Sequence, residues 1–547
     1  MFPALRALLV LVVALTLSPA AVATAEDDGI PRTYLGNSFG AEQTILPTSY
    51  EHQSKLWFQD DAWWALMYQP ADGSSGIFEL LPDHTWRPTG TVISTNPADM
   101  GDALLDGNNL YVVTRAVPGT LEFRLLTYDE RAREYTPQSS QPVPITARGS
   151  RAPAAIAKDT TGRLWVAFAG SPTVLISHSD DSGSTWTEPA PPAVPTGATA
   201  SFGEVAAVVA FGERIGVMWS DQAGDAFRFA VHRDGAPNNR WTEETPLAGA
   251  GQADNHISLK SAGSGQTATV IAAVKTSLGD RGEPASSPLI MVLRREQDGA
   301  WTTAVGSTVN DGMDSPHIQV DESTDSVYLM ADAMGGIYGK RSSLRELSFG
   351  PGRGLPFAVV RDSRLKDVTG SKLPVNATTG LVVLASGTAD NRYSHAEMPL
   401  ASPDNLPSTP AADDVVAPTT PGELTAQTSP SGTVSITWAA ANDGDVWAPA
   451  SDGVPVAGYT VYRDGLELGA TASTSYGDVP PVPGASFEYS VEAVDRAGNR
   501  SAPATVLVAV PDRQSADQRL RLWFLLALAG LVAVAVAVAV TGQRRRR

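Results

Sequence analysis

The chain has 547 residues, of which 42% are hydrophobic and 18% charged, and its formal net charge is −19. This length and composition allow several domains with buried cores, and the acidic balance argues against nucleic acid as a partner, because phosphate binding needs a basic patch. Cysteine is absent, which excludes thiolate metal sites and cysteine nucleophiles and, for an exported protein, is more typical of a bacterium.

The N-terminus has the pattern of an export signal. Arg6 precedes an apolar run over residues 7–17, and small residues follow as far as Ala23-Thr24-Ala25. A charged start, an apolar core and an A-x-A site predict a signal peptide over residues 1–25. The alternative is a first membrane anchor, but the apolar run is short for crossing a bilayer.

A repeated pattern runs from about residue 50 to 400, within a domain predicted over residues 30–400. An apolar strand, a polar turn with Asp or Gly and a second strand recur at intervals of roughly 50 residues, often followed by a turn before Trp. The seven copies begin near Leu56, Ala103, Ala155, Ala207, Ile257, Ile318 and Leu373. Short strands at a fixed period indicate an all-β fold, a β-propeller in which each repeat forms one four-stranded blade.

The first and last segments of this region indicate how the ring of blades closes. The seventh copy lacks an obvious fourth strand, and residues 33–46 precede the first copy without a blade of their own. We therefore expect the N-terminal segment to supply the outermost strand of the last blade in a seven-bladed propeller. A six-bladed propeller with an irregular unit, or a two-sheet sandwich, is the alternative.

A second module follows a linker. Residues 401–417 are rich in Pro, Ala, Ser and Asp and predict an extended spacer. Residues 418–511 contain Trp438 on an alternating strand, the strand Gly458–Gly465 and then Tyr489. In this order they resemble a fibronectin type III domain, and the resemblance implies a seven-stranded β-sandwich that serves as a spacer or a docking surface.

The C-terminus has the pattern of a membrane anchor. Residues 522–541 carry no charge and no proline, and they are long enough to form one transmembrane helix. Trp523 stands at the outer edge of this stretch, and residues 542–547 form a tail with four arginines that we expect in the cytoplasm. The sequence thus predicts a single-pass type I protein of the cell membrane with most of the chain extracellular.

One short motif is specific. Residues 179–186 match S-x-D-x-G-x-T-W, the Asp-box of sialidases and related propellers. The fixed positions are Ser179, Asp181, Gly183, Thr185 and Trp186. We expect a structural turn, in which the Asp carboxylate accepts hydrogen bonds from turn amides, Gly permits the backbone and Trp packs between strands. The head resembles bacterial cell-surface propellers of this sialidase-like type, joined to a fibronectin type III module and an anchor.

The resemblance to sialidases is incomplete. Arg151-Ala152-Pro153 resembles the first arginine motif of that family, but residues 167–178 contain no carboxylate where the family's acid would fall. The sequence offers no convincing Tyr–Glu nucleophile pair and no second or third arginine. No catalytic residue is therefore assigned, and enzymatic activity is uncertain.

The residues that precede the first strand of each repeat are polar and should converge on the central channel. They are Asp99, Asp102, Arg151, Glu204, Asp254, His256, Asp314 and His317. Such a ring could coordinate a divalent cation or hydrogen-bond a sugar, and no other cofactor is expected. The alternative is that these side chains bond backbone amides and fix contacts between blades. Trp63 and Trp64 are candidates for stacking on a sugar, although one of the two should face the core.

These patterns favour an extracellular binding or scaffold protein that recognises glycans or proteins through the propeller face. A sialidase-like glycoside hydrolase is the alternative, and two carboxylates at a glycosidase separation on one face would favour it. A sensor subunit is a third hypothesis, but a cytoplasmic tail of a few residues leaves little room for signalling.

Overall fold

The computed structural model describes residues 31–400 and 417–511, except for positions 42, 44, 97–100, 118, 148–152, 171, 202, 361, 430–431, 444–453, 457, 472, 481, 483 and 495–497. The predicted signal peptide (1–25), all but the last residue of the predicted linker (401–417), the predicted membrane span (522–541) and the tail (542–547) lie outside the described residues. Within the described residues, no helix has the length and apolar character needed to cross a bilayer.

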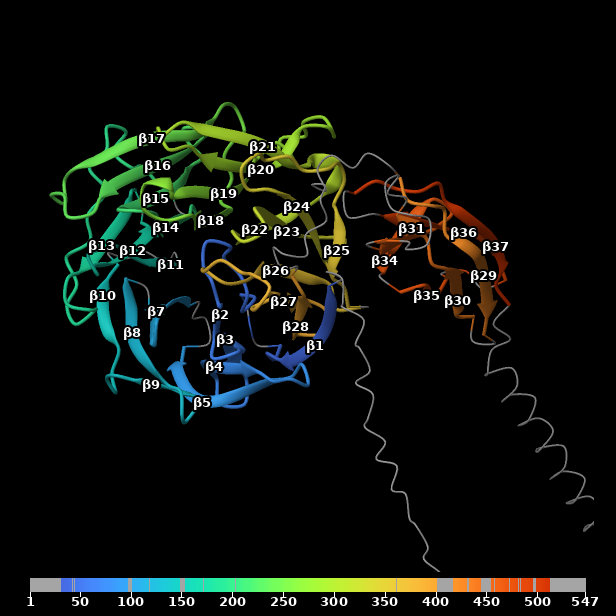
Figure 1. Cartoon of the computed structure of the whole chain (residues 1–547), viewed down its shortest axis with the longest axis horizontal. Helices are drawn as coiled ribbons and strands as arrows, with labels where there is room; N and C mark the ends of the chain where they lie inside the picture. Colours follow the sequence, from blue (N-terminus) through green and yellow to red (C-terminus); the bar gives the residue numbers. More distant parts are fainter. Residues whose placement is uncertain are drawn as a thin grey trace, which may run out of the picture.

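Seven antiparallel sheets stand around a common centre, which is the arrangement of a β-propeller (Figure 1). In blades 1 to 6 the first strand in sequence is innermost. Blades 1 and 2 contain β2 (Leu56–Gln59), β3 (Ala62–Gln69), β4 (Ser74–Leu80) and β5 (Trp86–Ser94), then β6 (Asp102–Asp106), β7 (Asn109–Val117), β8 (Thr120–Asp129), β9 (Glu134–Pro137) and β10 (Val143–Thr146). Blades 3 and 4 contain β11 (Ala154–Lys158), β12 (Leu164–Ala169) and β13 (Val174–Ser179), then β14 (Ala206–Ala210), β15 (Arg214–Asp221), β16 (Ala226–Arg233) and β17 (Trp241–Ala248).

The other three blades complete the ring. Blades 5 and 6 contain β18 (Ile257–Ala262), β19 (Thr269–Lys275), β20 (Pro288–Arg295) and β21 (Trp301–Thr308), then β22 (Asp314–Asp321), β23 (Ser326–Ala333), β24 (Gly336–Ser343) and β25 (Leu355–Ala358). Blade 7 contains β26 (Leu365–Thr369), β27 (Leu381–Gly387), β28 (Arg392–Met398) and β1 (Arg32–Ser38). The short 3-10 helices η1 (Gly265–Thr267) and η2 (Val309–Asp311) lie in connections.

The propeller has seven sheets, which equals the number of repeats in the sequence. The seventh blade, however, begins earlier in the chain than the sequence pattern predicts. The first strand of blade 7 is β26, whereas the sequence pattern placed it near Leu373. Leu373 is 38% exposed and lies in the connection to β27. The prediction was wrong because β26 carries Lys366 and Asp367, which interrupt the apolar run by which a strand is recognised.

The N-terminal strand closes the ring as expected. β1 pairs antiparallel with β28 at the rim of blade 7, with Arg32 opposite Glu397 and Leu35 opposite Ser394. Next to the centre, Leu56 of blade 1 forms a parallel bridge with Ser371 of blade 7. The first and last parts of the propeller are therefore joined at both rim and centre.

Apolar layers between neighbouring blades form the core. A blade is covered on both faces, so its inner strands are continuously apolar, as in β12, where every residue is buried. Trp63 packs in the layer towards blade 7 and Trp64 in the layer towards blade 2. Their exposures are 6% and 0%, so neither is a surface on which a sugar could stack.

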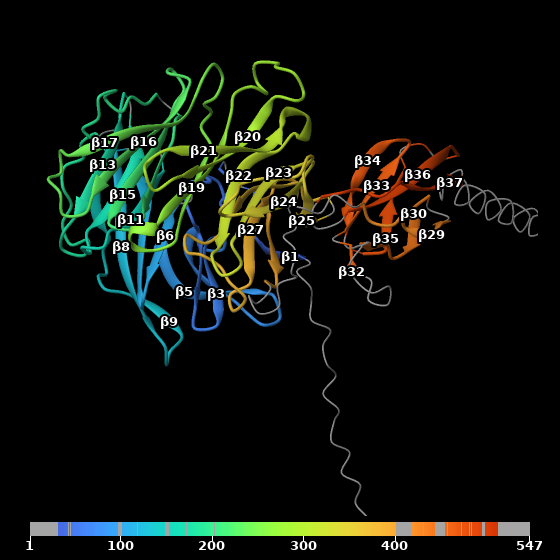
Figure 2. The same cartoon turned by 45° about the horizontal axis from the view of Figure 1, so that its top comes forward.

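Residues 417–511 form a second all-β unit that lies beside β25 in both views (Figures 1 and 2). Its sheets are β29-β30-β35, β34-β33-β36-β37 and the short pair β31-β32. Their bounds are β29 (Gly422–Thr428), β30 (Val434–Ala439), β31 (Asn442–Asp443), β32 (Val454–Pro455), β33 (Gly458–Arg463), β34 (Leu466–Thr471), β35 (Ser475–Asp478), β36 (Ser486–Val494) and β37 (Ala504–Ala509). One apolar cluster contains Trp438, Val461 and Tyr489 from both larger sheets.

The two units touch through charged and apolar contacts. Arg353, in the connection before β25, donates to Glu467 of β34 at 2.9 Å and to the carbonyl of Asp311 at 2.7 Å. Ala470 of β34 packs in the same apolar cluster as Tyr338 of β24.

Candidate functional site

Residues 46–55 carry the chain from the rim of the propeller to its centre, because β1 is outermost in blade 7 and β2 innermost in blade 1. The last five residues of this connection are buried. The hydroxyl of Thr48 lies 2.7 Å from that of Ser386 in blade 7, and the amide of Gln53 donates to the carbonyl of Ala154 in blade 3 at 2.9 Å. One segment thus spans the centre and lines the channel with polar side chains.

One end of the channel, called the mouth here, collects residues from several blades. Asp254 and His256 directly precede β18, Lys275 ends β19 and Asp314 begins β22. In an antiparallel hairpin, the start of the first strand and the end of the second lie at the same edge. The amide of Asp254 accordingly donates to the carbonyl of Lys275 at 3.1 Å. Glu51, from the connection to blade 1, reaches the same place.

Five side chains form the mouth cluster: Glu51, Asp254, His256, Lys275 and Asp314. The Nε2 atom of His256 lies 3.9 Å from a Glu51 oxygen and 3.7 Å from an Asp314 oxygen, and Nδ1 lies 3.7 Å from Asp254. Lys275 Nζ lies 3.2 Å from Asp254 and 2.8 Å from Asp314. Three carboxyl groups therefore surround two basic groups.

Burial and charge together set the protonation of this cluster. Burial disfavours the charged imidazole, but the carboxylates of Glu51, Asp254 and Asp314 outweigh it and raise the pKa of His256 to about 9. Burial also opposes ionisation of Asp254, yet His256 and Lys275 lower its pKa to about 2. The pKa of Asp314 is lowered for the same reasons. Burial raises the pKa of Glu51, so the cluster holds one carboxyl that keeps its proton more readily than the others.

A second acidic group lies next to the cluster. Asp332, at the end of β23, is buried, and this burial raises its pKa to about 6 against the attraction of Lys366, whose Nζ lies 3.5 Å away. Asp367 of β26 accepts hydrogen bonds from the hydroxyls of Ser49 and, at 3.1 Å, Ser315. The mouth thus has hydrogen-bonding groups from blades 5, 6 and 7 and from the N-terminal connection.

Two of the residues predicted to face the channel accept backbone N–H groups. Asp102 has no exposed surface, and its carboxylate accepts backbone N–H groups of Ser54 and Ile156, each at 2.7 Å. Glu204 is buried and accepts backbone N–H groups of Ser201 and, at 2.9 Å, Gln222. These two carboxylates match the structural alternative of the sequence prediction.

The remaining predicted residues are distributed differently. Asp254, His256 and Asp314 come together in the mouth cluster. His317 has no exposed surface and lies deeper in the channel, although its sequence context resembles that of His256. Asp99 and Arg151 lie outside the described residues.

The Asp-box lies at the opposite end of blade 3, after β13, and forms a self-contained turn. Asp181 accepts the amide and hydroxyl of Thr185 at 2.8 and 2.7 Å and the hydroxyl of Ser179 at 2.8 Å. These hydrogen bonds lower the pKa of Asp181. Trp186 meets Phe123 of blade 2 edge to face, with ring centroids 5.2 Å apart. The motif fixes a turn and a contact between blades, away from the mouth.

The mouth cluster does not fit a divalent cation. Asp254 and Asp314 already share the ammonium group of Lys275, and a protonated His256 has no lone pair to offer a metal. Across the described ranges, no group of three or more His, Asp and Glu side chains is arranged to hold a metal ion. The arrangement suits hydrogen bonding to a ligand instead.

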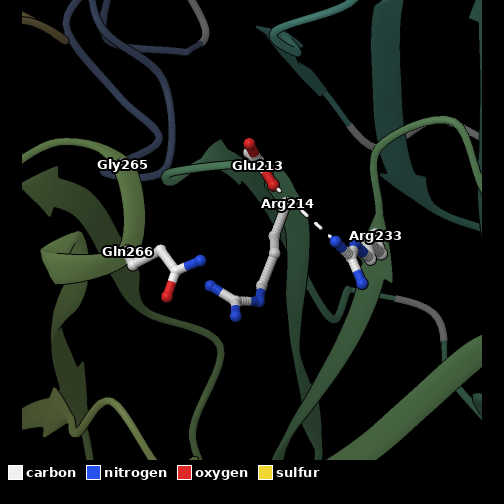
Figure 3. A pocket seen from close by; sticks show the side chains of 5 residues that line it. All are labelled: Glu213, Arg214, Arg233, Gly265 and Gln266. Carbon is white, nitrogen blue, oxygen red and sulfur yellow. Dashed lines mark ion pairs between the residues drawn. The ribbon is translucent and has the colours of Figure 1, made fainter.

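A hollow of about 150 Å³ lies at the end of the propeller away from the mouth (Figure 3). It is lined by Glu213, Arg214, Arg233, Gly265 and Gln266. Arg214 begins β15 and pairs across the sheet with Arg233, which ends β16. Glu213 and Arg233 are 3.9 Å apart, and both side chains are mostly exposed, so this hollow has no buried polar group aimed into it.

Several residues of the site were missed from sequence. Glu51, His52 and Lys55 directly precede the first strand of blade 1, so the rule that identified Asp254 and Asp314 would have found them had it been applied to the first repeat. Lys275 and Asp332 lie at the ends of second strands, where no sequence signal separates a residue of the mouth from a strand end in solvent.

The comparisons with known proteins give similarities of fold at low identity. Neither a scan against protein-family models nor a search of curated proteins found a match. Among solved structures, a fungal lectin from Aleuria aurantia with a six-bladed β-propeller fold is 13% identical, with a TM-score of 0.34 over 57% of this chain and 99% of the lectin. The RS223 β-xylosidase is 11% identical, with a TM-score of 0.28 over 47% and 96%. A NanB sialidase mutant from Streptococcus pneumoniae is 11% identical, with a TM-score of 0.29 over 56% and 54%. Similarity at this level does not define a shared activity.

Proposed function

We propose that this chain is a binding protein of the cell surface, and that the mouth of its propeller recognises a polyhydroxylated ligand, a glycan. The observation that carries the proposal is the mouth cluster, in which charged donors and acceptors from two blades and the N-terminal connection converge on the axis. Sugar hydroxyls both donate and accept hydrogen bonds, so they match a site with ionised Asp254 and Asp314 beside protonated His256 and Lys275.

The solvent exposure of the side chains in the mouth cluster supports a ligand site at the mouth. The side chain of Asp314 is 37% exposed, whereas those of Asp254, His256 and Lys275 are 14%, 19% and 14% exposed. A ligand can therefore reach Asp314 first and the other groups through limited openings. The Nδ1 atom of His256 is buried and faces the Asp254 carboxylate at 3.7 Å, so the protonated ring is held in place beside the acids that a ligand would meet.

The rest of the chain fits display at a surface. We infer that residues 418–511 are a fibronectin type III-like spacer, because three- and four-stranded sheets enclose Trp438 and Tyr489 in one core. The export signal, the apolar stretch 522–541 and the basic tail would hold the propeller outside the cell, tethered by one helix. Protease accessibility of the propeller on intact cells tests this orientation.

Glycan binding is tested with the full chain purified in detergent and applied to a glycan array. The variant Asp314→Asn removes the charge of the most exposed acid in the cluster and should reduce binding at least tenfold. Asp325→Asn is the matched control, because Asp325 belongs to the same blade, is also 37% exposed and pairs with Arg345 at 3.2 Å at the other end of the blade. Equal binding by the two variants would place recognition elsewhere.

A glycoside hydrolase is the second candidate, and the pKa values at the mouth favour it. A glycosidase needs one carboxyl that keeps its proton and one that is ionised. Here the pKa of Glu51 is raised, while those of Asp254 and Asp314 are lowered, and all three groups contact His256. Fluorogenic glycosides test this reading. Turnover that is lost in Glu51→Gln but retained in Asp325→Asn would support a hydrolase, and no turnover of any glycoside would leave binding alone.

A further inference from the structure

Below the mouth, the described residues place three lysines and one carboxylate in the channel. Lys55 comes from the N-terminal connection, Lys260 from β18 and Lys372 from the connection after β26, and the carboxylate is that of Asp102. Lys55 and Lys260 are 2% and 3% exposed, and Asp102 is fully buried. Positive groups therefore outnumber the negative group at this level of the channel.

The carboxylate is already engaged by one of the three lysines. Lys372 donates to Asp102 and, at 2.7 Å, to the carbonyl of Ile156. Among the described residues, Lys55 donates to two neutral acceptors, the carbonyl of Ser49 at 2.9 Å and the side chain of Gln53 at 3.1 Å, and the carboxylates of Asp102, Glu51 and Asp367 act on its charge from farther away.

Lys260 has even fewer hydrogen-bond acceptors than Lys55. Within the described part of the chain it donates only to the hydroxyl of Ser54, at 3.0 Å. An ammonium group buried without a counter-ion is strongly destabilising, and burial lowers the pKa of Lys260 to about 7 and that of Lys55 to about 8.

Unpaired hydrogen-bonding atoms lie around these lysines. Among the described residues, the ring nitrogens of His317 and His52 and the side-chain oxygen of Gln319 are buried without a well-aligned hydrogen bond, although Gln319 lies close enough to His317, and the Pro153 backbone to His52, to act on the pKa of each imidazole. Burial lowers the pKa of His317 well below the usual value, and the charges of Lys260 and Lys55 lower it further. A Cβ atom at Gly370 would lie 2.7 Å from His317 Nε2 and 3.2 Å from the Gln319 oxygen, so a side chain at this position would press on both polar atoms.

We propose that the channel of the propeller holds a compact monovalent anion of the halide class between Lys260, Lys55 and His317. Such an ion supplies the missing negative charge and accepts N–H groups from the ammonium groups and from the imidazole. The near-complete burial of these residues excludes a large organic anion. The site is separate from the mouth and does not depend on glycan recognition.

The test uses the full chain, desalted into sodium gluconate and titrated with sodium bromide at constant ionic strength. Bromide should raise the apparent unfolding temperature in a saturable manner, by about 2 °C or more, because a ligand that binds only the folded state stabilises it. Lys260→Met keeps the length of the side chain without its charge and should abolish this bromide-dependent rise. Lys158→Met, which removes a lysine that pairs with Asp106 instead of lining the channel, should leave it unchanged.

Crystals of the unaltered chain soaked in bromide provide a second measurement that does not depend on a variant. An anomalous peak between Lys260 and His317 would support the site. The proposal is overturned if the channel shows no such peak, if gluconate and bromide give the same unfolding temperature, or if a folded Lys260→Met variant keeps the full bromide effect. If the lysines are neutral and bind no anion, gluconate and bromide will give the same unfolding temperature.

Discussion

Lys275 and Asp314 form an ion pair, 2.8 Å from Nζ to Oδ1, that joins blade 5 to blade 6 at the mouth of the channel. The same ammonium group lies 3.2 Å from Asp254, so one lysine neutralises acids that begin two successive blades. The pair therefore has two effects, since it holds neighbouring blades together and keeps Asp314 ionised for a ligand.

Replacing this lysine should destabilise the propeller. Lys275→Met removes the ammonium group that Asp254 and Asp314 share, and we expect the free energy of unfolding to fall by about 2 kcal/mol, since the pair is largely but not fully buried. Denaturant titration measures the loss. Lys158→Met, at the more exposed pair with Asp106, should cost clearly less than Lys275→Met, about 1 kcal/mol or below. A similar loss in both variants would contradict the role given to Lys275.

The raised pKa of His256 predicts a stability that falls in alkaline solution. A histidine whose pKa rises from 6.5 when unfolded to about 9 when folded contributes its full stabilisation below pH 6.5 and loses it as pH rises through about 9. The loss amounts to about 3 kcal/mol at most. Lys260 and Lys55 titrate in the same range with the opposite sign, because their pKa values are lowered.

The histidine effect is therefore measured as a difference between two proteins. Unfolding free energies of the unaltered chain and of His256→Gln, followed from pH 6 to pH 10, should converge as pH increases. Parallel curves would show that His256 is neutral in the folded chain.

The glycine of the Asp-box offers a test with a matched control. Gly183 has a φ of +91°, and an added Cβ would lie 1.9 Å from the ring of Phe123 in the neighbouring blade. Gly162, in the same blade, has the same φ and no atom within 4 Å of that position. Gly162→Ala should cost about 1 kcal/mol for the backbone alone, and Gly183→Ala about 2 kcal/mol more because Phe123 must move. Thermal unfolding compares the two, and equal losses would show that the turn does not press on blade 2.

The contact between the two units can be measured by a double-mutant cycle. Arg353→Gln and Glu467→Gln should show a coupling energy of about 1 kcal/mol in the full chain, because both side chains are about one-fifth exposed. The pair of Arg463 and Asp478, which lies within the second unit, is the reference. Zero coupling between Arg353 and Glu467, with normal coupling in the reference pair, would mean that the units do not dock in solution.

The arrangement of blades could be predicted from sequence because each repeat combines an apolar strand with a turn, and both signals are local. The turns before Trp86, Trp241 and Trp301 indeed precede outer strands. The signal failed at β26, where Lys366 and Asp367 face the mouth and break the apolar run. Polar residues that serve a site make the sequence of a strand less typical of a strand. The prediction therefore failed for a strand that lines the channel.

The site was harder to predict than the blades. The matching positions of His256 and His317 suggested equivalent roles, but one stands at the mouth among carboxylates and the other lies deeper beside lysines. Asp102 looked like a ligand residue and instead accepts two buried backbone amides. Such differences depend on which neighbours arrive from distant parts of the chain, and one repeat carries no information about them.

The route of the N-terminal connection makes the mouth a late product of folding. Glu51 reaches the axis on the same stretch of chain whose preceding strand, β1, must wait for β28, which is among the last parts of the propeller to be synthesised. We therefore expect a chain that lacks β1 or blade 7 to leave the mouth incomplete, however well its middle blades form. A complete mouth therefore requires that the N-terminal segment and blade 7 have met, so the binding surface that we propose is present only in chains that contain both.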